Sequence, residues 1–314
     1  MPDAVDVIGF LGTGRMGMPM CANLVRAGHV VVAHDLRAEL ETPVSASGAR
    51  WASTAAEAAA VADVLITMLP GPNEVAEAMI GALRAMRPGS TWIDTSSNAA
   101  ALAEPIRALA GERGVDVLDA PVGGGVAAAR DATLAFYVGG SAEVLDRHRG
   151  VFDALGDPRR LVHVGGPGTG YTTKLLVNLL WFGQAVATAE ALLLGKRAGI
   201  DLGVLRGALA DSAAASRFVS SDLDALFAGD YLTSFELDRC CEELANVTAQ
   251  AHELGVPFEL SDLVERIHLR ALSRYGPVGG ELLAVALLEE EAGTLLRVDG
   301  AVTGSTEENG LPSV

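Results

Sequence analysis

The 314-residue chain carries 40 acidic and 23 basic side chains, a formal net charge of −17, and half of its residues are hydrophobic. This length allows two domains with separate cores. The acidic balance argues against nucleic acid as a partner, because phosphate binding needs a basic surface. The three cysteines give no paired disulfide framework, which favours the cytoplasm, and the first residues are typical of a strand rather than a signal peptide.

A glycine-rich turn is the first motif in the chain. The apolar run 5–11 leads into GFLGTGRMG, and a helical pattern follows. In the spacing G-x-G-x-x-G the first glycine lets the chain turn, the second lets a pyrophosphate approach, and the third lets the helix pack on the strand. A second strand, 30–33, ends just before Asp35, where a carboxylate would receive the adenosine ribose hydroxyls. We therefore predict a dinucleotide site rather than a turn without a ligand.

The predicted cofactor-binding residues of this region are Gly12, Gly14, Arg15, Met16, Gly17, Asp35 and Arg37. Asp35 favours NAD, because a carboxylate repels the 2′-phosphate of NADP. Arg37 lies close in sequence and would partly offset that repulsion, so NADP stays possible.

Strands and helices continue to alternate through the N-terminal half. Further strands are predicted at 64–69, 91–93, 115–118, 133–138 and 161–164. A ligand lies across the carboxyl ends of the strands in an open parallel sheet. This nominates Met68, Leu69 and Pro70 after one strand and Ser97 after the next. Capping of the following helix by Ser96, Ser97 and Asn98 is the alternative interpretation.

Three successive glycines, Gly123, Gly124 and Gly125, follow the strand at 115–118. Their backbone N–H groups can hold a carboxylate, and we predict that they bind substrate. The alternative interpretation is a flexible loop without a ligand.

An apolar run from Leu175 to Leu194, in which Glu190 is the only charge, predicts a long helix that must be buried. Polar interruptions make a membrane span the weaker interpretation. Lys174 and Asn178 are four residues apart near the helix start, so they share one face and could converge on a small polar molecule. The alternative for Lys174 is a packed aliphatic stem with the charge in solvent.

No convincing strand follows Asp201, and helical periods fill the rest of the chain. The predicted fold is an α/β Rossmann-type doubly wound, mostly parallel sheet, then a long interdomain helix and an all-α domain. We place the NAD(P)-binding domain at 1–165 and the all-α substrate and dimerisation domain at 166–297. The polar end, 298–314, is predicted to be a disordered tail.

Four stretches, in order, resemble the β-hydroxyacid dehydrogenase family, which includes 3-hydroxyisobutyrate dehydrogenase and has an NAD(P)-binding domain of the 6-phosphogluconate dehydrogenase type. They are IGFLGTGRMGMPMCANLVRAGHVV, DAPVGGGVAAARDATL, GTGYTTKLLVN and GPVGGELLAVALLEEEAG. The resemblance covers nearly the whole chain up to about Leu296. It implies that Lys174 is the catalytic lysine, that Asn178 and the Gly123–Gly125 loop bind substrate, and that Ser97 lies near the nicotinamide.

Two positions depart from the family pattern. Gly123 stands where the family usually has serine, and the usual Lys-Asp-Leu falls on Glu242-Glu243-Leu244. A positive charge near the active site thus becomes negative, which suggests a less anionic or amine-bearing substrate as a hypothesis. Imine reductases share the fold, but many lack the lysine that stands here at position 174, so Lys174 favours alcohol and carbonyl chemistry.

We expect an NAD(P)-dependent oxidoreductase that moves a hydride reversibly between the cofactor and a small 3-hydroxy acid or semialdehyde, with Lys174 as general acid and base. The alternatives are an imine reductase or amine-oxidising dehydrogenase, and a non-catalytic NAD(P)-binding sensor. The apolar long helix also suggests a homodimer or homotetramer. We expect no metal site, because the six histidines lack metal-ligand spacing.

Overall fold

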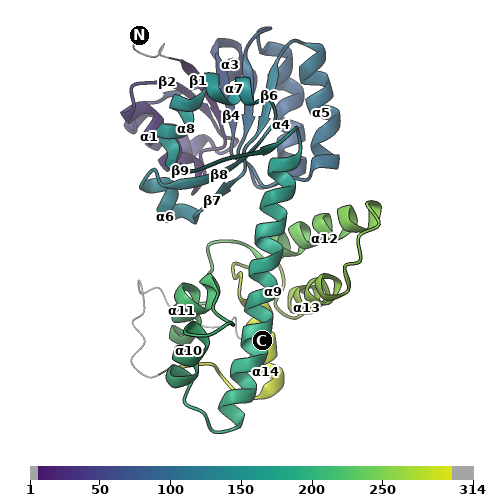
Figure 1. The fold of residues 1–314 in the computed structure, drawn as a ribbon. Helices are drawn as coiled ribbons and strands as arrows, with labels where there is room; N and C mark the ends of the chain where they lie inside the picture. The colour runs from purple at the N-terminus through teal and green to yellow at the C-terminus, as the bar shows by residue number, and fades with distance from the viewer. Residues whose placement is uncertain (1–5, 299–314) are drawn as a thin grey trace. The chain divides into compact units, whose positions relative to one another are not determined.

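The structure is a computed structural model that describes residues 6–298. It divides into two compact units, with the boundary between Leu175 and Leu176 (Figure 1). The N-terminal unit is built around a nine-stranded sheet, and the C-terminal unit is helical.

The sheet of the N-terminal unit has the doubly wound order that binds dinucleotides. Its strands are β1 (Val7–Leu11), β2 (Val30–His34), β3 (Arg50–Trp51), β4 (Val64–Thr67), β5 (Thr91–Asp94), β6 (Asp116–Asp119), β7 (Val122–Gly123), β8 (Leu134–Gly139) and β9 (Gly156–Gly165). The order is β3-β2-β1-β4-β5-β6-β8-β7, with β9 beside β8. All neighbours from β3 to β6 are parallel, and only β8 runs antiparallel to β6 and β7. The chain reverses its direction of winding between β1 and β4, which is where such sheets bind ligands.

Helices cover both faces of this sheet. They are α1 (Gly17–Arg26), α2 (Glu41–Ala46), α3 (Ala55–Val61), α4 (Pro72–Ala85), α5 (Ala100–Glu112), α6 (Gly125–Arg130), α7 (Ala142–Arg147) and α8 (Arg149–Leu155), with a short 3-10 turn η1 (Ala38–Leu40). Successive strand residues point to opposite faces. On β4, Val64 and Ile66 accordingly join one core cluster while Leu65 joins the other.

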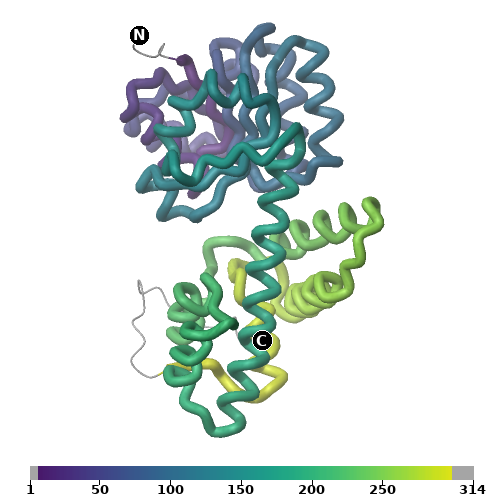
Figure 2. The backbone as a smooth tube through the Cα atoms, viewed as in Figure 1, coloured from purple at the N-terminus to yellow at the C-terminus, as the bar shows by residue number. Residues whose placement is uncertain are grey.

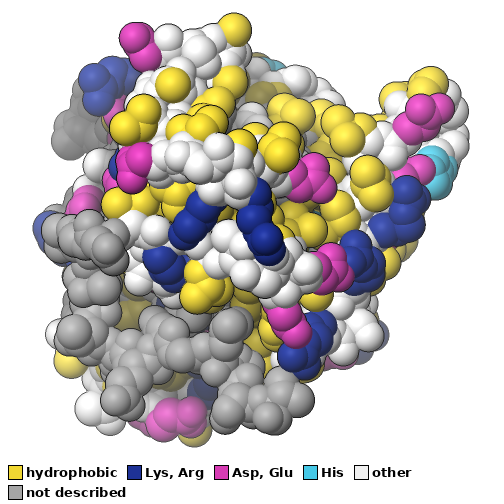
Figure 3. Space-filling view, turned by 90° about the horizontal axis from the view of Figure 1, so that it is seen from below, with side chains coloured by type: hydrophobic (Ala, Val, Ile, Leu, Met, Phe, Trp, Pro, Cys, Tyr) yellow, Lys and Arg dark blue, Asp and Glu magenta, His cyan; other side chains and the backbone are white. Residues whose placement is uncertain are grey.

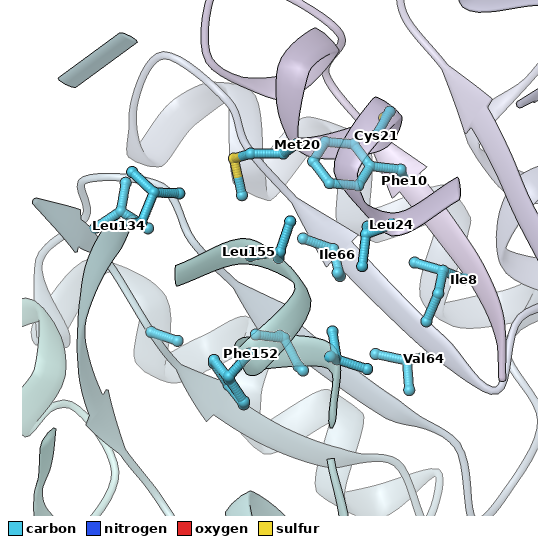
Figure 4. Packing of buried hydrophobic residues seen from close by; sticks show 14 of the residues in the cluster. Ile8, Phe10, Met20, Cys21, Leu24, Val64, Ile66, Leu134, Phe152 and Leu155 are labelled. Atoms are coloured by element: carbon cyan, nitrogen blue, oxygen red, sulfur yellow. The ribbon is translucent and has the colours of Figure 1, made fainter. Parts of the chain in front are cut away.

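The larger of these two clusters packs β1, β4 and β8 against α1 and α8. Figure 4 shows Ile8, Phe10 and Ile66 from the sheet facing Met20 and Leu24 of α1. Phe152 and Leu155 of α8 close the same cluster, and Phe152 meets Phe136 edge to face with ring centroids 5.1 Å apart. Short strands of Val, Ile and Leu buried on both sides are typical of a parallel sheet.

The predicted Rossmann-type fold is confirmed, and each predicted strand is present. The sequence prediction did not include α2, β3, α4, α6 or β7. Helix α4 begins at Pro72, directly after the loop that follows β4. Proline is tolerated at the first helical position because the N–H that it lacks would have no partner within the helix.

The C-terminal unit is all-α in its described residues, apart from one isolated bridge between Glu236 and Gly279. Its elements are the greater part of α9 (Thr169–Arg197), then α10 (Leu202–Ala210), a π-helical turn η2 (Phe218–Asp222), α11 (Leu223–Ala228), α12 (Leu237–Glu253), α13 (Glu259–Tyr275) and α14 (Leu283–Ala292). Its core gathers around one side of α9, where Ala189 and Leu192 are fully buried. The tail predicted as disordered, 298–314, lies outside the described residues except for Val298.

Helix α9 is one unbroken helix that leaves the N-terminal unit and continues into the C-terminal unit (Figure 2). It is the one described helix long and apolar enough to cross a membrane by length and composition alone. The expectation that it is buried on every face is wrong for the single chain, because Leu180 is 63% exposed and Leu194 is 72% exposed. Apolar side chains on more than one face of a helix need more covering surface than this one chain supplies.

Replacing Gly170 with alanine should destabilise the N-terminal unit. A Cβ at Gly170 would overlap the carbonyl oxygens of Asp119 and Tyr137, which belong to the backbone and cannot turn away. We expect a loss of about 1–3 kcal/mol, typical of overpacking, seen as a lower melting temperature in circular dichroism. Gly81 is the control, because it is exposed in α4 and an alanine there meets no atom within 4 Å. Gly81→Ala should melt at or above the wild-type temperature, and a Gly170→Ala protein that does the same would contradict this packing.

Candidate active site

The glycine turn after β1 has the geometry of a pyrophosphate site. Gly12 adopts φ +95°, and a Cβ there would overlap the carbonyl oxygen of Met68. A Cβ at Gly17 would overlap the carbonyl oxygen of Gly12, so the start of α1 packs directly on the turn. Around Gly14, by contrast, the one neighbour in the described chain is the Arg37 guanidinium, 3.4 Å from an ideal Cβ. The first and third glycines are thus required by packing, while the second leaves open space at a helix N-terminus where an anionic group fits.

Asp35 follows β2 and closes one end of this turn. Its Oδ2 accepts a hydrogen bond from the Thr13 backbone N–H at 2.8 Å, and its Oδ1 accepts from the Arg37 backbone N–H and Nε at 3.0 Å each. Burial alone would raise the pKa of Asp35, but the hydrogen bonds from Arg37 and Thr13 outweigh it and lower that pKa. Asp35 is therefore ionised at neutral pH and fixed beside the turn, as a ribose-binding carboxylate needs to be.

The loops after β4 and β5 are tied together by a buried polar network. Asp94 at the end of β5 accepts from Thr67 Oγ1 at 2.8 Å and from the Ser96 N–H at 3.0 Å. Ser96 Oγ in turn accepts from the Leu69 N–H at 2.9 Å. Burial raises the pKa of Asp94. The network fixes the path of the Met68-Leu69-Pro70 segment against the Ser96-Ser97 turn.

Ser96 and Ser97 therefore have different surroundings. Ser96 is fully buried and hydrogen-bonded within the network, whereas Ser97 follows it in the chain and is half-buried. The residue before α5, Ala99, has no capping side chain, and its own backbone N–H donates to Asn98 Oδ1 at 2.8 Å. Ser97 remains the residue of this turn that we predict to lie near the nicotinamide.

The glycines at 123–125 lie at the junction of a short strand and a helix. Gly123 ends the short strand β7, which pairs with β8, and Gly124 precedes α6 with φ +115°. Gly125 also has a positive φ, +67°. At Gly123 a Cβ would meet its nearest atom, the Tyr137 hydroxyl, at an ordinary 3.5 Å. The space for the family's serine is thus present, and packing does not impose the glycine.

The first turn of α9 is held by Asp119, at the end of β6. Its carboxylate accepts from the backbone N–H groups of Gly168 and Gly170 at 2.8 Å each and from that of Tyr171 at 3.2 Å. Burial raises the pKa of Asp119, and these three hydrogen bonds only partly offset that effect. The carboxylate therefore fixes the position of the helix start through three backbone hydrogen bonds.

Tyr171 links Asp119 to the loops that are predicted to bind cofactor. Its hydroxyl donates to Asp94 Oδ2 at 2.7 Å, and burial together with the Asp94 charge raises its pKa well above the ordinary value. Sequence reasoning missed Asp94, Asp119 and Tyr171 as a group. The available signal was that Asp94 and Asp119 each directly follow a predicted strand, and in the structure they are register partners on adjacent strands.

Lys174 is half-buried and follows Tyr171 within the helix that Asp119 anchors. Asn178 lies four residues further along α9 and donates from Nδ2 to Glu243 Oε2 of α12 at 2.5 Å. Glu243 replaces the family's aspartate, whereas Glu242 forms an ion pair with Arg239 at 2.8 Å. No group of three potential metal ligands occurs among residues 6–298.

Two aromatic side chains, Phe218 and Tyr231, lie in the core of the C-terminal unit. The Tyr231 hydroxyl donates to Glu289 Oε2 at 2.6 Å and accepts from Arg297. These two aromatic side chains are structural.

Comparison with known protein families shows which family the chain belongs to. Residues 7–166 match the NAD-binding domain of 6-phosphogluconate dehydrogenase, and residues 168–287 match the NAD-binding domain of NADP-dependent 3-hydroxyisobutyrate dehydrogenase. The chain belongs to the β-hydroxyacid dehydrogenase family. The resemblance deduced from the four motifs is thereby confirmed, and so is NAD or NADP as the cofactor of this family member.

Individual relatives agree with this membership. A probable 3-hydroxyisobutyrate dehydrogenase of Mycobacterium tuberculosis is 42% identical over 196 residues, which are 62% of this chain and 66% of the relative. An NAD-dependent L-serine dehydrogenase of Pseudomonas aeruginosa is 40% identical over 201 residues, 63% of this chain and 67% of the relative. The chain thus aligns with just under two thirds of the mycobacterial protein's length.

Among solved structures, a Mycobacterium tuberculosis 3-hydroxyisobutyrate dehydrogenase with L-serine superimposes with a TM-score of 0.84 at 30% identity. The match covers 90% of this chain and 99% of that one. The similarity in fold therefore extends over both units of the β-hydroxyacid dehydrogenase chain.

Replacing Asp35 with serine should weaken the binding of NAD and favour the binding of NADP. The variant loses the carboxylate that would accept the ribose hydroxyls and frees Arg37 to meet a 2′-phosphate. We expect the dissociation constant for NAD to rise about tenfold or more, and the ratio of NADP to NAD affinity to increase, both measured by calorimetry. Asp157→Ser is the matched control. Asp157 on β9 also pairs with an arginine two residues further on, Arg159, whose Nε lies 3.0 Å from Asp157 Oδ1. Equal cofactor affinities in wild type and Asp35→Ser would remove Asp35 from the site.

Proposed function

We propose that this chain is an NAD(P)-dependent dehydrogenase that reversibly oxidises the CH–OH group of a small 3-hydroxy acid to the semialdehyde. The observation that carries the proposal is the placement of Lys174 in the N-terminal part of α9, whose first turn Asp119 fixes to the carboxyl end of β6. A proton-transfer group is thus attached to the same edge of the sheet as the cofactor loops. The family membership and the names of the relatives support the same reaction class.

The open space at Gly14 and the fixed carboxylate of Asp35 are suited to NAD(P). When bound, the nicotinamide accepts or returns a hydride at its C4 atom. In the oxidative direction, neutral Lys174 accepts the hydroxyl proton as the carbinol carbon gives up its hydride. In the reductive direction, the Lys174 ammonium polarises the carbonyl and donates the proton to its oxygen.

Other residues position the substrate. Asn178 contacts the reacting oxygen or a group beside it, and the backbone N–H groups of Gly123, Gly124 and Gly125 hold the carboxylate. Gly12, Gly14, Arg15, Met16, Gly17, Arg37, Met68, Leu69, Pro70 and Ser97 complete the cofactor site with Asp35. Holding the reacting groups in line is the main contribution of such a protein to catalysis.

A second candidate is an amine-oxidising dehydrogenase or imine reductase on the same scaffold. The observation that favours it is Glu242, which stands where the family has lysine, next to the buried carboxylate of Glu243. Turnover of cyclic imines compared with 3-hydroxy acids separates the two candidates.

We also propose that the protein acts as a homodimer or homotetramer in the cytoplasm, with residues 1–165 binding the cofactor and 166–297 supplying the substrate and subunit contacts. The support for an oligomer is a set of strongly exposed apolar side chains on the C-terminal unit. They are Leu180, Leu194, Val204, Leu254 and Leu260. Figure 3 shows hydrophobic side chains in several groups between charged ones on one face of the molecule. Burial of such groups is what drives subunit association.

Replacing Lys174 with alanine should abolish most of the turnover while the cofactor still binds. General acid and base catalysis contributes about 10²–10⁴-fold to the rate, so we expect kcat to fall by about that factor, measured by NADH absorbance with a panel of short 3-hydroxy acids. The chain has only one other lysine, Lys196, which lies in the last turn of the same helix and donates to the Leu295 carbonyl.

Lys196→Ala is therefore the control for the loss of a lysine from α9, and it should keep near wild-type turnover. Unchanged turnover in Lys174→Ala would remove this lysine from the mechanism. No oxidation of any 3-hydroxy acid by the wild type would refute the proposed function itself.

A further inference from the structure

Tyr137 places a hydroxyl group beside the Gly123–Gly125 turn. Its half-buried side chain lies on the same face of β8 as Ala135, which is the register partner of Gly123 on β7. A Cβ built at Gly123 would lie 3.5 Å from the Tyr137 hydroxyl and 3.7 Å from its Cε2 atom. Aromatic side chains can reach such a diagonal neighbour on the adjacent strand. The phenol oxygen therefore borders the space that a side chain at position 123 would fill.

The hydroxyl of Tyr137 is not used by the fold. Its backbone N–H donates to the Pro121 carbonyl at 3.2 Å, so the strand fixes the residue. Within residues 6–298, however, the Tyr137 hydroxyl has no hydrogen-bond partner. The phenol hydroxyls that each donate to a carboxylate are those of Tyr171, Tyr231 and Tyr275. Tyr137 is thus the tyrosine whose donor is available to a ligand.

The backbone of Tyr137 meets the start of α9. A Cβ at Gly170 would lie 2.4 Å from the Tyr137 carbonyl oxygen, so this glycine faces β8. Lys174 is four residues further along α9, which puts it on the same face of the helix, one turn on. Gly123, Tyr137, Gly170 and Lys174 all belong to the N-terminal unit. One strand residue thus contacts the glycine turn through its side chain and the start of α9 through its backbone.

The position of this hydroxyl bears on the missing serine at position 123. Gly123 removes a side-chain donor from the turn that we propose to hold the substrate carboxylate. An ionised carboxylate only accepts hydrogen bonds and has about four acceptor sites, so it can use donors in addition to backbone N–H groups. A phenol is such a donor, and a hydrogen bond from a hydroxyl to an ionised carboxylate is among the strong ones. Tyr137 presents this donor from the neighbouring strand.

We propose that Tyr137 is a substrate-binding residue, whose hydroxyl donates to the substrate carboxylate at the Gly123–Gly125 turn in place of a serine at position 123. The inference rests on the proposed dehydrogenase function and adds a residue to its carboxylate site. The backbone N–H groups of the turn and the phenol hold the carboxylate together, and the substrate hydroxyl is directed to Lys174. Tyr137 takes no part in the proton transfer.

The test separates carboxylate binding from the chemical step. Kinetic constants are measured with 3-hydroxypropanoate, or with another short 3-hydroxy acid that the wild type oxidises faster, together with the inhibition constant of propanoate. Propanoate has the carboxylate but no hydroxyl, so it reports on carboxylate binding alone. In Tyr137→Phe, KM and the inhibition constant should each rise about tenfold or more, because a hydrogen bond to a charged group is lost. The value of kcat should stay within about threefold of wild type, as expected when only uniform binding is removed.

Two further substitutions complete the experiment. Gly123→Ser has room for its side chain, because the atoms nearest to a Cβ there lie at ordinary contact distances. Added to Tyr137→Phe, it should return KM to within about threefold of wild type, since a second hydroxyl then serves the same carboxylate. Tyr275→Phe is the matched control for the loss of a phenol hydroxyl. Tyr275 donates to Glu290 Oε2 in an exposed hydrogen bond at 3.0 Å, and its variant should leave all three constants unchanged.

Three results would overturn the inference. The first is a KM and a propanoate inhibition constant that stay within about twofold of wild type in Tyr137→Phe, which would mean that the ring only packs. The second is a fall in kcat with unchanged inhibition by propanoate, which would place the phenol at the reacting hydroxyl. The third is a failure of Gly123→Ser to restore KM in the Tyr137→Phe background.

The wild type distinguishes a failure of this inference from a failure of the proposed function. If it oxidises a 3-hydroxy acid and any of these three results is found, the dehydrogenase function stands and only the role of Tyr137 fails. If it oxidises no short 3-hydroxy acid, the proposed function fails, and the role of Tyr137 fails with it.

Discussion

The hydrogen bonds from the start of α9 and the residue before it to the carboxylate of Asp119 are the interaction on which the proposed active site depends. They attach a 29-residue helix to the end of a sheet strand through three backbone N–H groups. Gly170 allows the approach, since any side chain there would overlap the backbone of β6 and β8. Lys174 follows within the next turn, so its backbone position is set by the sheet and not by a loop.

In the proposed cofactor site, a strongly acidic protein would bind an anionic cofactor by local means. The groups that would meet the pyrophosphate are backbone N–H groups at the start of α1, whose partial positive charge does not depend on the net charge of the chain. Acidic side chains at the same edge each have a compensating partner. Asp35 is held by Arg37, Asp119 by the N-terminus of α9, and Asp94 by hydroxyl and N–H donors.

Much of the N-terminal unit was predictable from the sequence because its signals are local. The glycine-rich turn depends on backbone geometry, and the short apolar strands depend on burial. The sequence located the turn and the strands correctly. The contacts that Asp94, Asp119 and Glu243 make with α9 were not predictable, because they join residues 51 to 77 positions apart, as in Asp119 with Gly170, Asn178 with Glu243 and Asp94 with Tyr171. The exposure of α9 was mispredicted because apolar periodicity shows that a face needs covering and does not show whether the same chain covers it.

A crystal structure of the protein with a nicotinamide cofactor and a bound 3-hydroxy acid tests the central claim most directly. The account predicts that Lys174 Nζ lies within hydrogen-bonding distance, about 3 Å, of the substrate hydroxyl oxygen, with the Asp119 contacts to α9 intact. An ammonium group directed into bulk water, away from the nicotinamide and the substrate, would contradict it.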